Sequence, residues 1–184
     1  MADRRRLDAE LVRRRMAGGR AEARALVEAG RVLVGGSVAT KAARMVDPAE
    51  PLHVTGEPPR FVGRGGEKLA AALDGFAIDP QGLRVLDAGA STGGFTDCLL
   101  QAGAAEVVAL DVGHGQLHER LRRDDRVVVV ERTNLRSLEP GDFGTFDAAV
   151  ADLSFISLRL VMANLVAAVA PGGWMVLLVK PQFE

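Results

Sequence analysis

Short apolar runs alternate with helix-spaced apolar residues through the second half of the chain. The runs have the length and β-branched content of buried strands, and the segments between them place apolar residues on one helical face. Strands separated by helices predict a parallel, doubly wound α/β sheet with its ligand site at the carboxyl ends of the strands. The predicted strands are 84–87, 107–111, 127–131, 148–152 and 174–180, and the predicted helices are 69–76, 95–102, 116–122 and 158–169.

A smaller α+β domain is predicted at the start of the chain. Apolar residues at helical spacing indicate helices at 7–16 and 21–29. Gly35-Gly36 joins two short apolar strands in a hairpin, and residues 52–56 close the small sheet. The expected organisation is a first domain at 1–59, a linker at 60–67 and a second domain at 68–184.

Composition and charge narrow the class of protein. Hydrophobic residues make up 48% of the 184 residues, which is enough for a substantial core and argues against disorder. The lone Cys98 excludes an internal disulfide, and no apolar run is long enough to cross a membrane, so we expect a cytoplasmic protein without a membrane partner. Residues 1–68 carry 14 Lys and Arg against nine Asp and Glu, whereas the remainder is acidic. The basic first part predicts a polyanionic partner.

The most informative motif follows the first strand of the second domain. Its sequence, RVLDAGASTGGFTD, combines an acidic strand end, a tight turn and a helix start. A dinucleotide fingerprint needs G-x-G-x-x-G, and Ser91 replaces its second glycine, so a nicotinamide-dependent oxidoreductase is disfavoured. The turn instead resembles the S-adenosylmethionine (SAM) loop of Rossmann-like methyltransferases.

Further along the chain, Asp111 ends the second strand, where an acid can accept hydrogen bonds from ribose hydroxyls. Asn134 follows the third strand and could pair with an adenine edge, whereas Phe95 fits the core of its helix as well as a cofactor site. We expect no metal site. The predicted cofactor-binding residues are Asp87, Gly89, Ser91, Gly93, Gly94, Phe95, Asp111, Val112, Asn134 and Asp152.

Arginines cluster outside the apolar faces of the two N-terminal helices. This layout, with Arg6-Leu7-Asp8 and the VLVGG hairpin, resembles the alpha-L RNA-binding motif of a small-subunit ribosomal protein and many RNA-modifying enzymes. Gly19 departs from that motif, which usually has Ser there. The alternative is a solvated basic face, but the hairpin and the spacing favour RNA binding, with Arg13, Arg20 and Arg24 along one stripe. The predicted RNA-binding residues are Arg4, Arg6, Arg13, Arg20, Arg24 and Arg64.

Three further residues form the candidate catalytic set. Asp152 and Lys180 end predicted strands, and Lys68 precedes the first helix of the second domain. A lysine that closes a buried strand is unusual, because burying an unpaired ammonium is costly. GRGGEKL, LDAGASTGGFTD, ALDVGHGQL, ERTN, ADLSFISL and VKPQFE together resemble the TlyA (hemolysin A) family over essentially the whole chain.

This resemblance implies an FtsJ-like, SAM-dependent 2′-O-methyltransferase that acts on a cytidine ribose in ribosomal RNA or ribosomal subunits. It also implies a Rossmann-like sheet of strand order 3-2-1-4-5, incomplete because the last strands are absent. The family's Lys-Asp-Lys-Glu tetrad matches Lys68, Asp152 and Lys180, but the glutamate has no counterpart and Glu184 lies too close to Lys180 to be assumed a substitute.

Besides the disfavoured oxidoreductase, one alternative stays open at this point. The missing glutamate favours a non-catalytic or truncated RNA-binding relative of the family. Because the final strands that complete such a sheet are expected to be absent, the strand at 174–180 is expected to be an exposed apolar edge at which two copies of the chain could associate.

Overall fold

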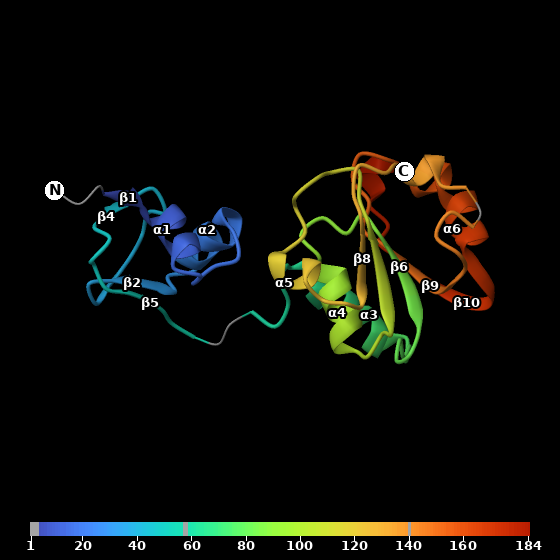
Figure 1. The fold of residues 1–184 in the computed structure, drawn as a ribbon, viewed down its shortest axis with the longest axis horizontal. Helices are drawn as coiled ribbons and strands as arrows, with labels where there is room; N and C mark the ends of the chain where they lie inside the picture. Colours follow the sequence, from blue (N-terminus) through green and yellow to red (C-terminus); the bar gives the residue numbers. More distant parts are fainter. Residues whose placement is uncertain (1–3, 57–58, 140) are drawn as a thin grey trace. The chain divides into compact units, whose positions relative to one another are not determined.

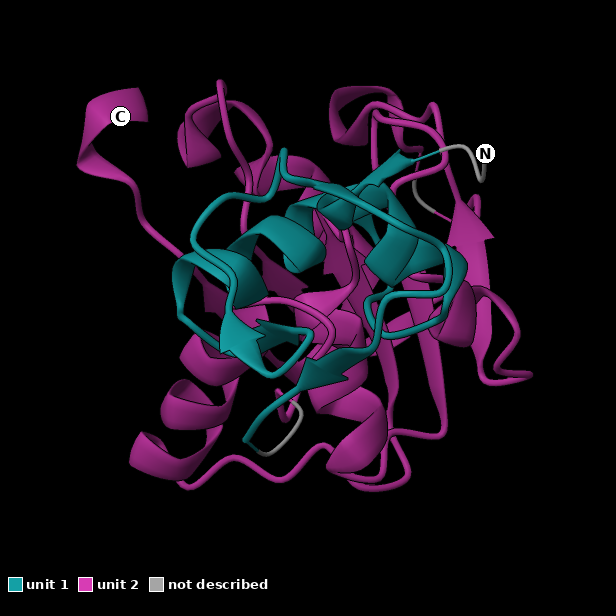
Figure 2. Ribbon diagram, turned by 90° about the vertical axis from the view of Figure 1, so that its left-hand side faces the viewer, with its two compact units in different colours: residues 1–58 teal, residues 59–184 magenta. Residues whose placement is uncertain are grey.

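A computed structural model describes residues 4–56, 59–139 and 141–184 (Figure 1). The chain divides into two compact units, residues 1–58 and 59–184, which Figure 2 shows in separate colours. Residues 1–3 and 57–58 of the predicted first domain lie outside the described residues.

The first unit has two helices and short antiparallel strands. Strand β2 is central and pairs with β3 and β5, and β1 pairs with β4. The elements are β1 (Arg5–Arg6), α1 (Leu7–Arg13), α2 (Arg20–Glu28), β2 (Val32–Val34), β3 (Ser37–Val38), β4 (Met45–Val46) and β5 (Leu52–Val54). The predicted hairpin and second helix are confirmed. Helix α1 is shorter than predicted because Arg15 has a left-handed φ of 59°, and two-residue strands such as β1 and β4 leave no alternation to recognise.

Parallel strands form the sheet of the second unit. They are β6 (Arg84–Ala88), β7 (Glu106–Leu110), β8 (Val127–Val130), β9 (Phe146–Ala151) and β10 (Val169–Leu177). Among the described residues the sheet has five strands in the order β10-β9-β6-β7-β8, which is the predicted order 3-2-1-4-5 read from β8. The predicted parallel α/β class is therefore confirmed.

Helices cover both faces of this sheet (Figure 1). They are α3 (Gly65–Gly75), α4 (Gly94–Gln101), α5 (Glu119–Arg122) and α6 (Met162–Ala168), with short 3₁₀ turns η1 (Leu135–Ser137), η2 (Leu158–Leu160) and η3 (Pro181–Phe183). Val85 in β6 packs toward α3 and α4, whereas its neighbour Leu86 packs toward α6. This alternation buries the sheet on both sides, as a doubly wound fold requires.

The prediction that residues 60–67 form a linker is wrong, because most of this segment packs into the second unit. Phe61 is buried, and α3 begins at Gly65, so Lys68 lies in the first turn of the helix rather than before it. The glycines of residues 60–67 predicted a flexible segment, but in the structure they allow close packing against α4. A Cβ atom on Gly94 would lie 2.9 Å from the backbone nitrogen of Gly66. Small residues on both helices therefore let α3 approach α4.

Other element boundaries also differ from the predictions. The helix expected at 116–122 is reduced to α5, and the one at 158–169 is divided into η2 and α6. Strand β10 begins at Val169 and ends at Leu177, which leaves Lys180 in the loop after the strand. β10 lies at one edge of the sheet, and self-association at this edge stays a prediction. No helix in the described ranges is long and apolar enough to cross a membrane.

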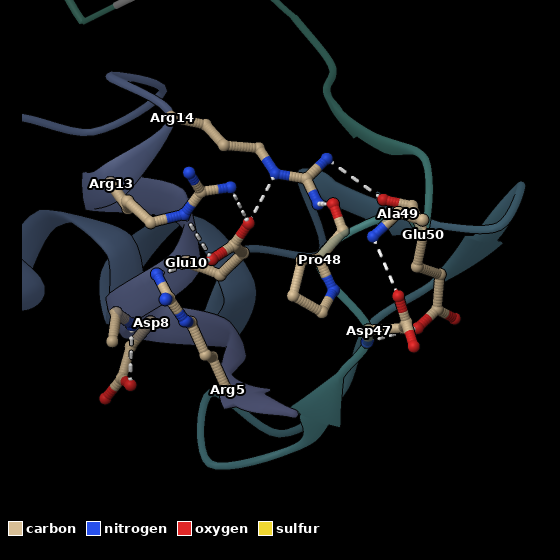
Figure 3. Close-up of polar contacts among 10 residues, drawn as sticks. Arg5, Asp8, Glu10, Arg13, Arg14, Asp47, Pro48, Ala49 and Glu50 are labelled. Carbon is tan, nitrogen blue, oxygen red and sulfur yellow. Dashed lines mark hydrogen bonds and ion pairs between the residues drawn. The ribbon is translucent and has the colours of Figure 1, made fainter. Parts of the chain in front are cut away.

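Arg14 connects α1 to the turn before β5 (Figure 3). Its Nε donates to Glu10 Oε1 at 2.8 Å, and its two terminal nitrogens donate to the carbonyls of Glu50 and Pro48 at 2.9 and 2.7 Å.

Arg14→Ala should therefore destabilise the first unit by about 1–3 kcal/mol, because a buried carboxylate and two carbonyls lose donors. Hydrogen exchange of the α1 amides measures this loss. The exposed Arg4→Ala is the control, and equal protection in both variants would contradict the assignment.

Candidate functional site

The turn after β6 brings two parts of the second unit into close approach. Gly89 has a φ of +85°, and a Cβ atom there would lie 3.0 Å from the carbonyl oxygen of Asp152. Gly93 precedes α4 with a φ of +96°, and a Cβ atom there would overlap Leu121. A side chain at either position would combine backbone strain with a steric clash, so glycine is required at both.

Asp111 holds this turn from the end of β7. Its Oδ2 accepts a hydrogen bond from the Ser91 amide at 2.8 Å, and its Oδ1 accepts one from the Gly113 amide at 2.6 Å. Ser91 adopts a left-handed φ of 50°, which this contact helps to fix. The carboxylate therefore orders two loops on the same side of the sheet.

Asp87 lies beneath the turn and is completely buried. Its Oδ2 accepts a hydrogen bond from the Thr96 hydroxyl at 2.6 Å, whereas its Oδ1 has no hydrogen-bond partner among the described residues. Burial raises the pKa of Asp87 to about 7, and the nearby charges of Asp111 and Asp152 act in the same direction. Asp87 is thus a support of the turn and lies outside the cavity above it.

A cavity of about 990 Å³ opens beside the carboxyl ends of β6, β7 and β9. Its lining includes six of the predicted cofactor residues, namely Gly89, Ser91, Asp111, Val112, Asn134 and Asp152. Asp87, Gly93, Gly94 and Phe95 are not part of the lining. Of the two roles that the sequence left open for Phe95, the structure favours the core, because its ring is buried against Gly65.

Several lining residues were not foreseen from the sequence. Gln116 reaches the cavity and lies 3.3 Å from the Ser91 hydroxyl, and the loop 153–157 forms one wall together with Phe183. Phe155 is 92% exposed and its ring centroid lies 5.5 Å from that of Phe183. The ADLSFISL motif contained this loop, but nothing in its spacing indicated which side chains face the cavity.

Lys68, Asp152 and Lys180 meet at this end of the sheet. Asp152 Oδ1 lies 2.6 Å from Lys180 Nζ, and its Oδ2 lies 3.4 Å from Lys68 Nζ. Asp152 and Lys180 are about one-fifth exposed and Lys68 about half exposed, so the cluster is open to solvent on one side. Lys180 also donates to the Ser154 hydroxyl at 2.8 Å. Glu184 lies elsewhere, with its carboxylate on Ser157 and the Leu158 amide.

The predicted arginine stripe of the first unit is divided between two helices. Arg13 lies on α1 and donates to Glu10, whereas Arg20 and Arg24 lie on α2 and contact Asp8 together with Arg6. The helical spacing on which the stripe was predicted is wrong, because residues 14–19 are not helical. Of the other predicted arginines, Arg4 is exposed near the start of the chain and Arg64 precedes α3 in the second unit.

Comparison with known proteins identifies the family. Residues 61–184 match the model of the FtsJ-like methyltransferases, and residues 5–51 match that of the S4 domain. A Mycobacterium tuberculosis protein named 16S/23S rRNA (cytidine-2′-O)-methyltransferase TlyA is 53% identical over 100% of this chain and 69% of its own length. The chain belongs to the TlyA family.

Other members of the TlyA family agree with this assignment. Hemolysin A of Brachyspira hyodysenteriae is 40% identical over 90% of this chain and 69% of its own length. A solved Streptococcus thermophilus structure whose name contains the word hemolysin has 41% identity and a TM-score of 0.73, and the match covers 100% of this chain and 68% of that one. The family resemblance expected from the motifs is therefore confirmed, as is the RNA-binding fold class of the first unit.

Titration of Asp87 should be visible in the stability of this TlyA-family chain. Its folded-state pKa of about 7 is above its ordinary value of 3.8, so its contribution to the unfolding free energy is complete below about pH 4 and is lost as pH rises toward 7. Relative to Asp87→Asn, the wild type should lose up to about 4 kcal/mol between pH 4 and 8.

Urea unfolding followed by the fluorescence of Trp174 measures this difference, since the single tryptophan lies in the second unit. Asp79→Asn, an exposed carboxyl outside the sheet, provides the control for a lost acid. Parallel pH profiles for the wild type and Asp87→Asn would contradict the assignment.

Proposed function

We propose that this chain methylates the 2′-hydroxyl of a cytidine in ribosomal RNA, with SAM as the methyl donor. The observation that carries the proposal is the contact of Asp152 with the side-chain nitrogens of Lys68 and Lys180, at the margin of the cavity that the glycine turn lines. Membership of the FtsJ-like methyltransferases and the activity named for the M. tuberculosis relative support the same reaction. Such a substrate would place the protein in the cytoplasm.

The donor set at the cavity suits a cationic, ribose-containing cofactor. Asp111 presents a partly buried carboxylate to the cavity, Asn134 presents an amide, and Gly89 leaves room above the end of β6. The carboxylates of Asp111 and Asp152, both in the lining of the cavity, place negative charge where it attracts a sulfonium ion. SAM supplies an electrophilic methyl group when it is bound.

Each residue of the Lys-Asp-Lys cluster has a distinct task in this reaction. Lys180 accepts the proton of the 2′-hydroxyl at Nζ, which requires the neutral amine. Asp152 fixes the position of that nitrogen through the 2.6 Å contact, with the Ser154 hydroxyl as a second partner at 2.8 Å. Lys68 is the more exposed ammonium, and it orients the ribose or a neighbouring phosphate as a point charge.

Removal of the base should separate chemistry from cofactor binding. Lys180→Met should lower the rate of methyl transfer by about 10²–10⁴-fold, because the hydroxyl loses its proton acceptor. Binding of SAM, measured by calorimetry, should be nearly unchanged. Lys41→Met, in the first unit, serves as the matched lysine control. A Lys180→Met protein that lost both activity and SAM binding would contradict the base assignment.

Transfer of tritiated methyl groups from SAM to bacterial ribosomal subunits tests the reaction itself. Subunits and their extracted RNA are offered separately, so the assay also shows which form is recognised. Retention of the label on the ribose supports the proposal. A chain that binds RNA but neither binds SAM nor transfers label would instead be a non-catalytic relative.

RNA binding is proposed to reside in the basic first unit. Arg20→Gln should weaken binding of ribosomal RNA and reduce the slope of log affinity against log salt by about 1, because one phosphate contact is lost. Fluorescence anisotropy at several salt concentrations measures both quantities. Arg123→Gln, directly after α5, is the control, since Arg123 is exposed and pairs only with Glu119 among the described residues. An unchanged slope for Arg20→Gln would exclude this contact.

A further inference from the structure

Two carboxylates of α1, Asp8 and Glu10, are completely buried within a basic surface. Burying a carboxylate is unfavourable unless it is paired and hydrogen-bonded. Both are paired with arginines, and these contacts hold the pKa of Asp8 well below its usual range and lower that of Glu10 to about 2. Both side chains are therefore buried anions at neutral pH.

Three arginines from separate positions converge on Asp8. Arg6, at the end of β1, donates from Nε and Nη2 to the two carboxylate oxygens at 3.1 and 3.0 Å. Arg20 and Arg24, one turn apart on α2, reach Oδ2 at 3.1 and 3.4 Å. One carboxylate thus fixes guanidinium groups from two elements.

The charges of this cluster do not balance. One arginine would neutralise Asp8, and gathering three of them leaves an excess of two positive charges that repel one another. The arginine side chains are also 42–54% exposed, so the N–H groups that Asp8 does not use remain available on the outer side. An excess of exposed, oriented guanidinium donors is what a phosphate group requires.

Glu10 provides a contrast within the same helix (Figure 3). It pairs with Arg5, Arg13 and Arg14. Arg5 and Arg13 are about half exposed, but Arg14 is only 23% exposed and also donates to the carbonyls of Pro48 and Glu50. The Glu10 cluster therefore holds the unit together. Every arginine contacting Asp8, by comparison, keeps a solvent-facing side.

We propose that Asp8 is a positioning residue that orders Arg6, Arg20 and Arg24 to receive phosphate groups of the RNA backbone. This rests on the RNA-directed function proposed above. Flexible arginines lose conformational entropy when they bind, and a carboxylate that fixes them beforehand reduces this loss. Asp8 would thus increase RNA affinity although its own charge opposes that of the RNA.

The sign of one substitution separates this role from simple electrostatics. Asp8→Asn makes the surface more positive by one charge, so unassisted charge attraction predicts tighter RNA binding with a steeper salt dependence. Positioning predicts the reverse, with affinity for a labelled ribosomal RNA hairpin about tenfold weaker and a shallower salt slope. Glu28→Gln on α2 is the matched control, because Glu28 is exposed and its replacement adds the same charge without removing an arginine partner of Asp8.

A second measurement needs no substitution and so does not depend on whether Asp8→Asn folds. In the RNA-free wild-type chain, ¹⁵N relaxation should show ordered Nε–H groups for Arg6 and Arg24, which donate from Nε to Asp8, and a mobile one for the exposed Arg132. Equal mobility of all three overturns the proposal.

The binding outcomes also separate the two proposals. A wild-type chain that binds RNA, together with an Asp8→Asn protein that binds equally or more tightly, overturns the positioning role and leaves RNA binding intact. A wild-type chain without salt-dependent RNA binding overturns both. Circular dichroism and the salt slope distinguish weaker binding from a smaller folded fraction, because unfolding of some molecules leaves the slope unchanged.

Discussion

The candidate site depends on the close approach of the turn after β6 to the end of β9. The Asp152 amide donates to the Ala88 carbonyl at 3.2 Å, and the absence of a side chain at Gly89 permits this contact. On the other side of β9, the Leu178 amide donates to the Ala151 carbonyl at 2.9 Å and directs the chain toward Lys180. Packing of α3 on α4 places Lys68, a residue of α3, next to Asp152. Backbone pairing and small residues thus assemble a charged cluster whose outermost members in sequence, Lys68 and Lys180, are 112 residues apart.

Buried carboxylates in the two units show how the partner decides the charge state. Asp8 and Asp87 are the same residue type and both are inaccessible to solvent. Asp8 is surrounded by guanidinium groups and its pKa falls, whereas Asp87 has a hydroxyl partner and two neighbouring carboxylates and its pKa rises. Burial alone would raise both values. The first arrangement holds a fixed negative charge among arginines. The second keeps a carboxyl close to neutrality beneath the cavity in which SAM is proposed to bind.

Much of the second unit could be predicted because its signals are local and periodic. The alternating strands and helices gave the parallel sheet, and strand ends placed Asp111 and Asp152 on one side of it. Residues 60–67 were misread because a glycine-rich sequence is compatible with both a flexible linker and tight helix packing, and only the partner helix decides between them. The Asp8 cluster was also beyond prediction. Its acid and its arginines come from different elements, and their meeting depends on how α1 packs against α2.

The opposite charges of the two units follow from the opposite charges of their proposed ligands. An acidic second unit repels the RNA backbone but attracts a sulfonium cofactor, so charge attraction to RNA has to come from the basic first unit. Changes to the arginines around Asp8 should then act on the capture of RNA, whereas changes to the Lys-Asp-Lys cluster should act on the chemical step. Combining both tasks on a uniformly basic surface would weaken cofactor binding, because like charges raise the free energy of a bound cation. Separation of the charges between two units removes this conflict.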